Sequence, residues 1–131
     1  MQLKLSNAES RQRRILAVHD ISCVGRCSLT VALPVLSAMG FETSILPTSI
    51  LSTHTGGFTG YTYRDLVADM DPIVDHWRAL GLRFDAIYTG WLGTHHHIHR
   101  MSRLTDIFGA DNPMIVIDPV MGDNGRLYAT L

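Results

Sequence analysis

The feature that most constrains the fold is an alternation of short apolar runs with longer segments of helical periodicity. Apolar residues recur at three- and four-residue spacing in three segments, which predicts helices over residues 28–39, 63–80 and 94–108. The shorter apolar runs predict strands over residues 15–18, 42–46, 85–90 and 114–118. This β-α-β-α-β-α-β order is typical of a mostly parallel sheet with right-handed crossovers. The predicted fold class is α/β, with three α-β-α layers.

Three prolines set expectations about where these elements end. Pro34 predicts either a kink in the first helix or its true start, and Pro72 predicts a break near the middle of the second helix. Pro47 is expected to close the second strand. Ser28 is a candidate N-cap of the first helix, and Gly40 is expected to end it.

The last predicted strand, Met114 to Ile117, is expected to be buried, because parallel strands are normally covered on both faces. Only 13 residues follow Asp118, and no further helix is predicted to cover the strand. We therefore expect the chain to be the first half of a larger unit, ending in the middle of its own site.

Composition limits the classes of partner. The chain has 131 residues, 46% of them hydrophobic and 18% charged, with a formal net charge of −1. These values fit one globular domain and indicate neither a nucleic-acid nor a membrane partner. No apolar run is long enough to span a bilayer. Two cysteines, Cys23 and Cys27, imply no disulfide framework and are typical of a cytoplasmic protein.

Polar residues follow the predicted strands, and the carboxyl ends of parallel strands share one edge, where ligands bind in such folds. Asp20 ends the first strand and could accept a hydrogen bond from a substrate hydroxyl or cap the next turn. A long Thr-, Ser- and Gly-rich loop is expected over residues 48–60. Its Thr48 and His54 could orient a small polar ligand, or they could serve ordinary turn chemistry.

Two further turns complete this edge. Trp91, flanked by glycines, could stack on a flat ring or cover the sheet as a hydrophobic plug. Asp118 and Asp123 could hold Mg²⁺, which favours one or two carboxylates together with phosphate oxygens, or they could cap turns.

A histidine cluster opens the third predicted helix. His95 and His99 are four residues apart and could bind a transition metal, but consecutive histidines at a helix start more often face solvent. The glutamate of the H-E-x-x-H pattern is missing. The sequence also lacks a Walker A motif and a G-x-G-x-x-G motif, so a phosphate donor would be held by other means.

Taken together, the motifs resemble the N-terminal half of a pyridoxal (pyridoxine/pyridoxamine) kinase of the ribokinase superfamily. The similarity covers residues 15 to about 128 and rests most on the stretches 48–60, 89–93 and 118–128. The pairing of Gly-Trp-Leu-Gly with Asp-Pro-Val-Met-Gly-Asp is its most specific part. The resemblance implies a ribokinase-like fold over residues 14–131, with residues 1–13 as a flexible arm.

The resemblance also implies an activity, namely transfer of the ATP γ-phosphate to the 5′-hydroxymethyl group of a B6 vitamer. It places Asp20, Thr48, His54 and Trp91 at substrate positions and Asp118 beside the phosphates and Mg²⁺. A monovalent cation is a further candidate cofactor. Asp20 stands where pyridoxal kinases often have serine, and Trp91 where they usually have tyrosine, so the vitamer preference is open.

Length is the largest departure from this family, whose members are roughly twice as long. Their glycine-rich segment supplies the catalytic base and an anion-binding helix N-terminus, and nothing in this sequence matches it. No catalytic residue is therefore assigned, and the chain alone is expected to have little kinase activity. The alternatives are a hydroxymethylpyrimidine kinase of thiamin synthesis and a non-catalytic fragment or dimerisation module. A full-length relative is expected to be a homodimer.

Overall fold

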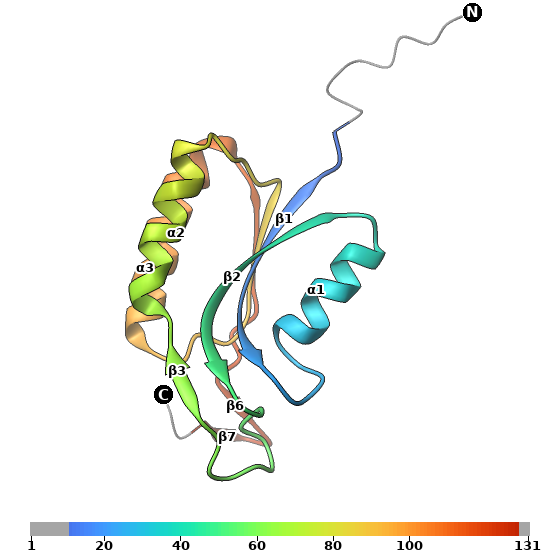
Figure 1. The fold of residues 1–131 in the computed structure, drawn as a ribbon, viewed down its shortest axis with the longest axis vertical. Coiled ribbons are helices and arrows are strands. Elements are labelled where there is room, and N and C mark those ends of the chain that lie inside the picture. The colour runs from blue at the N-terminus through green and yellow to red at the C-terminus, as the bar shows by residue number, and fades with distance from the viewer. Residues whose placement is uncertain (1–10, 129–131) are drawn as a thin grey trace, which may run out of the picture.

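The computed structural model describes residues 11–128, which form one five-stranded sheet with helices on both faces (Figure 1). The strands are β1 (Arg14–Ser22), β2 (Glu42–Leu51), β3 (Tyr63–Asp65), β4 (Ala86–Thr89) and β5 (Met114–Ile117). The helices are α1 (Leu29–Ala38), α2 (Val67–Ala79) and α3 (His95–Phe108), with a short 3₁₀ turn at Gly109–Asp111. Two short strands, β6 (Gly122–Asp123) and β7 (Arg126–Leu127), form a separate hairpin.

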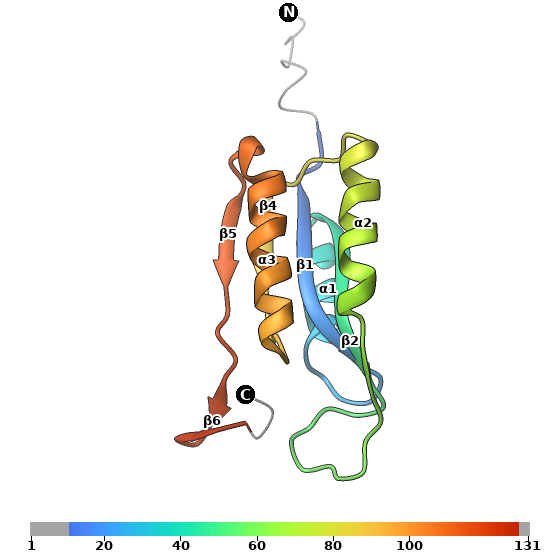
Figure 2. The same ribbon diagram turned by 90° about the vertical axis from the view of Figure 1, so that its left-hand side faces the viewer.

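The sheet order is β3-β2-β1-β4-β5. Strands β2, β1, β4 and β5 are parallel, and only β3 runs antiparallel to its neighbour. Helix α1 covers one face, and α2 and α3 lie side by side on the other (Figures 1 and 2). The three-layer, mostly parallel α/β fold is thus confirmed, and the parallel strand tips share one edge.

The hydrophobic core lies between the sheet and the α2–α3 pair. It contains Leu16, Val18, Leu46, Met70, Val74, Phe84, Ile87, Met101, Leu104 and Phe108. The rings of Phe84 and Phe108 meet edge to face, with centroids 4.9 Å apart. Burying each such side chain contributes about 1.5–3 kcal/mol. This packing fixes the position of α3 on the sheet, and with it the position of the turn that precedes α3.

The prediction that Pro47 closes the second strand is wrong, because β2 continues to Leu51. A proline cannot donate to a strand ladder, but β3 pairs with β2 only from Ser49 onward. At Pro47, β2 therefore pairs only with β1. Because no strand of the described chain lies on the β3 side at this position, the missing N–H of Pro47 costs no hydrogen bond on that side. The expected 48–60 loop shortens, since Thr48 to Leu51 belong to the strand.

The helices differ from expectation in several details. Residues 63–65 form β3 rather than the first turn of a helix, and α2 begins at Val67. Helix α2 then runs without a break through Pro72, while Met70 and Val74 on either side are buried against the core. Helix α1 begins at Leu29, so Pro34 does not mark its start. Each proline removes one backbone hydrogen bond, and in α2 the burial of Met70 and Val74 helps to hold the helix together.

Strand β5 is exposed, which overturns the prediction of a buried strand. It pairs with β4 alone, and its four residues are 43–68% exposed.

Among the helices of residues 11–128, none has both the length and the apolar character that a membrane span requires. Most of the predicted arm, residues 1–10, lies outside the described part of the chain, whereas Arg11 forms an ion pair with Asp85.

Candidate functional site

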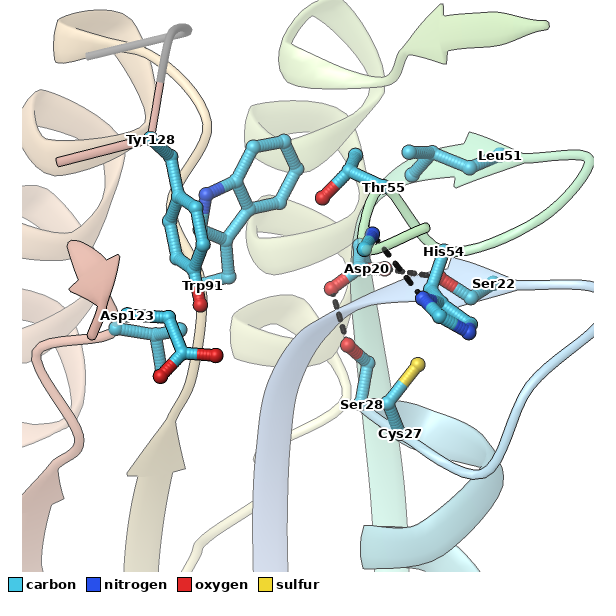
Figure 3. Close-up of a pocket in the computed structure, with 12 residues that line it drawn as sticks. Asp20, Ser22, Cys27, Ser28, Leu51, His54, Thr55, Trp91, Asp123 and Tyr128 are labelled. Carbon is cyan, nitrogen blue, oxygen red and sulfur yellow. Dashed lines mark hydrogen bonds between the residues drawn. The ribbon is translucent and has the colours of Figure 1, made fainter. Parts of the chain in front are cut away.

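A hollow of about 340 Å³ opens at the carboxyl ends of the parallel strands (Figure 3). Its lining comes from β1, the turn before α1, the end of β2 with the β2–β3 loop, the β4–α3 turn and the segment after β5. The lining residues are Asp20, Ser22, Cys27, Ser28, Leu51, His54, Thr55, Gly56, Trp91, Val120, Asp123 and Tyr128. Figure 3 shows Trp91, Asp123 and Tyr128 on one side and Asp20 and His54 on the other.

Asp20 is a buried carboxylate, only 3% exposed, that accepts two serine hydroxyl hydrogen bonds (Figure 3). The Ser22 hydroxyl donates to Oδ2 over 3.0 Å, and the Ser28 hydroxyl donates to Oδ1. Ser28 does occupy the N-cap position of α1, but its side chain makes no capping bond and its φ is 53°. The capping alternative for Asp20 therefore finds no support, and the carboxylate faces a hollow large enough for a small ligand.

His54 joins the two loops that form the other part of this wall. Its backbone N–H donates to the Val24 carbonyl, and its Nδ1 accepts from the N–H of Gly56 over 3.1 Å. The ring packs so closely on Gly25 that a Cβ there would lie 2.4 Å from His54 Cδ2. With a φ of 129°, Gly25 is also in a conformation that favours glycine. The loops after β1 and β2 are thus held together at the rim.

Trp91 lies in the turn after β4 and is the largest aromatic group in the lining. Its indole packs over Gly93, and its ring centroid lies 6.5 Å from that of Tyr63 at an interplanar angle of 82°. The side chain also lines two neighbouring hollows. Trp91 therefore forms a wall that borders open space in several hollows.

Of the other sequence candidates, Asp123 lines the same hollow, whereas Thr48 and Asp118 do not. Thr48 does not line the hollow; it is fully buried, and its carbonyl accepts from the N–H of Leu66. Asp118 is exposed and lines a second hollow of about 390 Å³, together with His19 and Trp91. The structure thus brings Asp20, His54 and Trp91 together and leaves Asp118 beside them, across the Trp91 wall.

Sequence reasoning did not single out Tyr128 or the serine partners of Asp20 as site residues. Tyr128 reaches the hollow because β6 and β7 form a tight hairpin, whose turn residues Asn124 and Gly125 have φ angles of 49° and 76°. The Asn-Gly pair was the available signal, since it favours a two-residue hairpin turn. The hairpin directs the chain back toward the strand tips.

His19 is a buried histidine near the end of β1, and its pKa is perturbed. Burial lowers its pKa below the ordinary value of 6.5, and the charges of Asp20 and Asp118 oppose that shift. The ring meets Tyr88 edge to face with centroids 4.5 Å apart. The lowered pKa favours the neutral imidazole at this edge of the sheet, although two carboxylates are near enough to influence it.

Within residues 11–128, no group of three or more His, Cys, Asp or Glu side chains is arranged to hold a metal ion. His95, His96 and His99 are exposed, as expected for consecutive histidines at a helix start, but His97 is fully buried. Its Nε2 lies 3.1 Å from Asp65 Oδ1. Asp118, a single exposed carboxylate, suits Mg²⁺ coordinated mainly by water and phosphate.

Comparison with known proteins gives a consistent family of relatives. No protein-family model matches the chain. It is 26% identical over 122 residues to the Saccharomyces cerevisiae protein named "Putative pyridoxal kinase BUD17", covering 88% of this chain and 38% of the yeast protein. A Bacteroides thetaiotaomicron structure titled "putative phosphomethylpyrimidine kinase", in a crystal form with pyridoxal, is 46% identical with a TM-score of 0.87. That match covers 92% of this chain and 42% of the other.

Pyridoxal kinase from Lactobacillus plantarum is 34% identical, with a TM-score of 0.80, over 91% of this chain and 42% of that one. The chain thus spans about two fifths of the length of the relatives that it matches. This coverage fits the expected partial match. In sequence and in fold, the chain is similar to part of the pyridoxal kinases, and its α/β fold is ribokinase-like.

Proposed function

We propose that this chain supplies the vitamer-binding part of a kinase that phosphorylates the 5′-hydroxymethyl group of pyridoxal, pyridoxine or pyridoxamine. The observation that carries the proposal is the hollow itself, which has a buried carboxylate on one side and an indole on the other. A flat heterocycle with polar substituents complements both walls. The relatives named as pyridoxal kinases, and the relative crystallised with pyridoxal, support the same substrate class.

Each side chain then has a distinct role. Asp20 accepts a hydrogen bond from a polar group of the ring, because the two serines leave part of its acceptor capacity free. Trp91 stacks on or borders the ring. His54 holds the rim loops in place, and Thr55 offers a hydroxyl in the part of the lining where Thr48 was expected. These four groups bind and orient the vitamer.

ATP and a divalent metal, Mg²⁺ in our proposal, would lie on the Asp118 side of the Trp91 wall. Mg²⁺ would neutralise charge on the transferring phosphates, and Asp118 would hold it directly or through water. We assign no general base within the chain. The proposal extends to a cytoplasmic location, which suits the two free cysteines, and to homodimerisation of a full-length protein.

A second candidate is phosphorylation of a hydroxymethylpyrimidine. The name of the Bacteroides relative and the carboxylate at position 20 favour it. Pyridine and pyrimidine vitamers differ in their ring nitrogens, so the carboxylate contact would separate them. Competition between pyridoxine and 4-amino-5-hydroxymethyl-2-methylpyrimidine for the purified chain tests which ring it prefers.

The decisive experiment measures binding and turnover separately. We expect pyridoxine to bind the purified chain, as seen by calorimetry. We also expect ATP-dependent phosphorylation well below the roughly 1 s⁻¹ lower end for kinases, because no base or anion-binding segment has been assigned. Turnover at or above that rate would overturn the expected inactivity. A folded chain that binds neither ring would overturn the vitamer proposal and favour a non-catalytic module.

A further inference from the structure

Trp91 separates two hollows of equal size. The site with Asp20 and a neighbouring hollow each measure about 340 Å³, and both are lined by Leu51, Thr55 and Trp91. The neighbouring hollow is completed by Tyr61, Tyr63, Gly93 and Thr94, none of which lines the site. Any movement of the indole would therefore transfer space from one hollow to the other.

Gly93 supports the indole from the side of the neighbouring hollow. A Cβ at this position would lie 2.6 Å from Trp91 Cη2 and 3.0 Å from both Cζ2 and Cζ3. The φ of Gly93 is not in the left-handed region, so the backbone alone does not require glycine here. Glycine is required because the six-membered ring of the indole occupies the place of a side chain.

Tyr63 limits the indole from a second direction. Its ring faces Trp91 nearly perpendicularly, at 82° with centroids 6.5 Å apart, and it lines only the neighbouring hollow. Tyr63 belongs to β3, which pairs with Leu51 of β2, a residue shared by both hollows. The Tyr63 side chain thus extends from a strand of the sheet and not from a loop.

We propose that Gly93 and Tyr63 are positioning residues that fix the Trp91 indole as the partition between the two hollows, and so set the width of the ligand site. Substitutions at Gly93 and at Tyr63 should move the Trp91 indole in opposite directions. A side chain at Gly93 pushes the indole toward Asp20 and narrows the site. Truncation of Tyr63 lets the indole move into the neighbouring hollow and widens the site. The part of this inference that concerns vitamers rests on the proposed function.

The test uses the fluorescence of Trp91 in a Trp77→Phe background, because the chain contains two tryptophans. Without ligand, Gly93→Ala and Tyr63→Ala should each change the emission maximum and acrylamide quenching of Trp91. The matched control is Gly109→Ala, since a Cβ at Gly109 meets nothing within 4 Å and its φ is not positive. Tyr63→Phe keeps the aromatic edge and should restore the parent signal.

Binding of two ligands then tests the direction of each effect. Gly93→Ala should weaken pyridoxine binding about tenfold, the scale of an overpacked site. Tyr63→Ala should leave pyridoxine binding nearly unchanged and strengthen binding of pyridoxine 4′-benzyl ether. If Gly93→Ala fails to fold by circular dichroism, the half-exposed Tyr63→Ala and its phenylalanine rescue decide the question.

The outcomes separate the two proposals. Unchanged Trp91 fluorescence in folded Gly93→Ala and Tyr63→Ala overturns the positioning role, whatever the ligand. Failure of the parent chain to bind pyridoxine overturns the vitamer function but leaves the fluorescence test of the partition intact. Altered fluorescence with equal effects of both variants on both ligands overturns the claim that the partition sets the width of the site.

Discussion

His97 Nε2 lies 3.1 Å from Asp65 Oδ1, and this contact joins α3 to β3. The same Asp65 carboxylate oxygen accepts the N–H of Val67 at the start of α2, over 2.7 Å. One carboxylate therefore connects a strand and two helices. The chain enters α2 and α3 at fixed points because these three groups satisfy one another.

His97→Ala should lower the free energy of unfolding by about 1–3 kcal/mol, because it removes a fully buried ring from the packing of α3 together with its hydrogen bond to Asp65. Urea unfolding followed by circular dichroism measures the change. The matched control is His96→Ala, on the exposed face of the same helix, which should stay within about 0.5 kcal/mol of the parent. Equal losses in the two variants would contradict the role of the His97–Asp65 contact.

Asp20→Asn should weaken pyridoxine binding about ten- to hundredfold. The substitution keeps the shape of the side chain but removes the charge that strengthens its hydrogen bonds, an effect of about 1.5–3 kcal/mol. Isothermal titration calorimetry measures the affinity. Asp106→Asn, on the exposed surface of α3, is the control and should bind like the parent. Unchanged affinity in Asp20→Asn would remove Asp20 from the proposed vitamer contacts.

The alternation of apolar runs and helical segments was enough to predict the layers, the parallel strands and their shared edge. Those features depend on local periodicity, which the sequence carries directly. The same reasoning correctly selected Thr94 to Phe108, where the Thr94 hydroxyl caps α3 by accepting from the His97 N–H. Asp20 and Trp91 could be selected in this way because each lies just after a predicted strand, and His54 because it lies in the loop predicted after the second strand.

The failures involve long-range pairing. β3 has only three residues and exists because it pairs with the end of β2, so no local pattern marks it. Thr48 was assigned to a loop for the same reason, and the extended β2 buries it instead. The exposure of β5 could not be predicted from its four apolar residues, since burial depends on which elements lie beside a strand.

The stability of the chain should fall as the pH is lowered below about 6.5, partly because of His19. Burial holds the His19 pKa below its ordinary value, so between the two pKa values the unfolded chain binds the proton and the folded chain does not. This contribution is present above the unfolded pKa and is lost as the pH falls toward the lowered, folded value. Asp20 and Asp118 reduce the effect without reversing it.

Urea unfolding at several pH values between about 5 and 8 measures this slope, in the range where histidine titrates. His19→Gln should flatten the slope below pH 6.5, even if the substitution alters the stability at pH 8. His76→Gln, at an exposed position of α2, is the control and should keep the parent slope. A parent slope that persists in His19→Gln would assign the pH dependence to other groups.

The exposed β5 predicts concentration-dependent association of the chain. The strand is at the edge of the five-stranded sheet, and Met114 and Ile117 are 68% and 67% exposed. Its open edge and apolar side chains can pair with another copy, whereas a lysine on an edge strand disfavours such pairing because its charge would lose water. Ile117→Lys should therefore shift the association to roughly tenfold higher concentration, equivalent to about 1.4 kcal/mol.

Sedimentation velocity over a concentration series measures this shift in association. Leu80→Lys removes an apolar side chain that is also largely exposed, at the end of α2 and away from β5, and should associate like the parent. A parent that remains monomeric throughout, or equal effects of the two lysines, would show that β5 is not the associating surface.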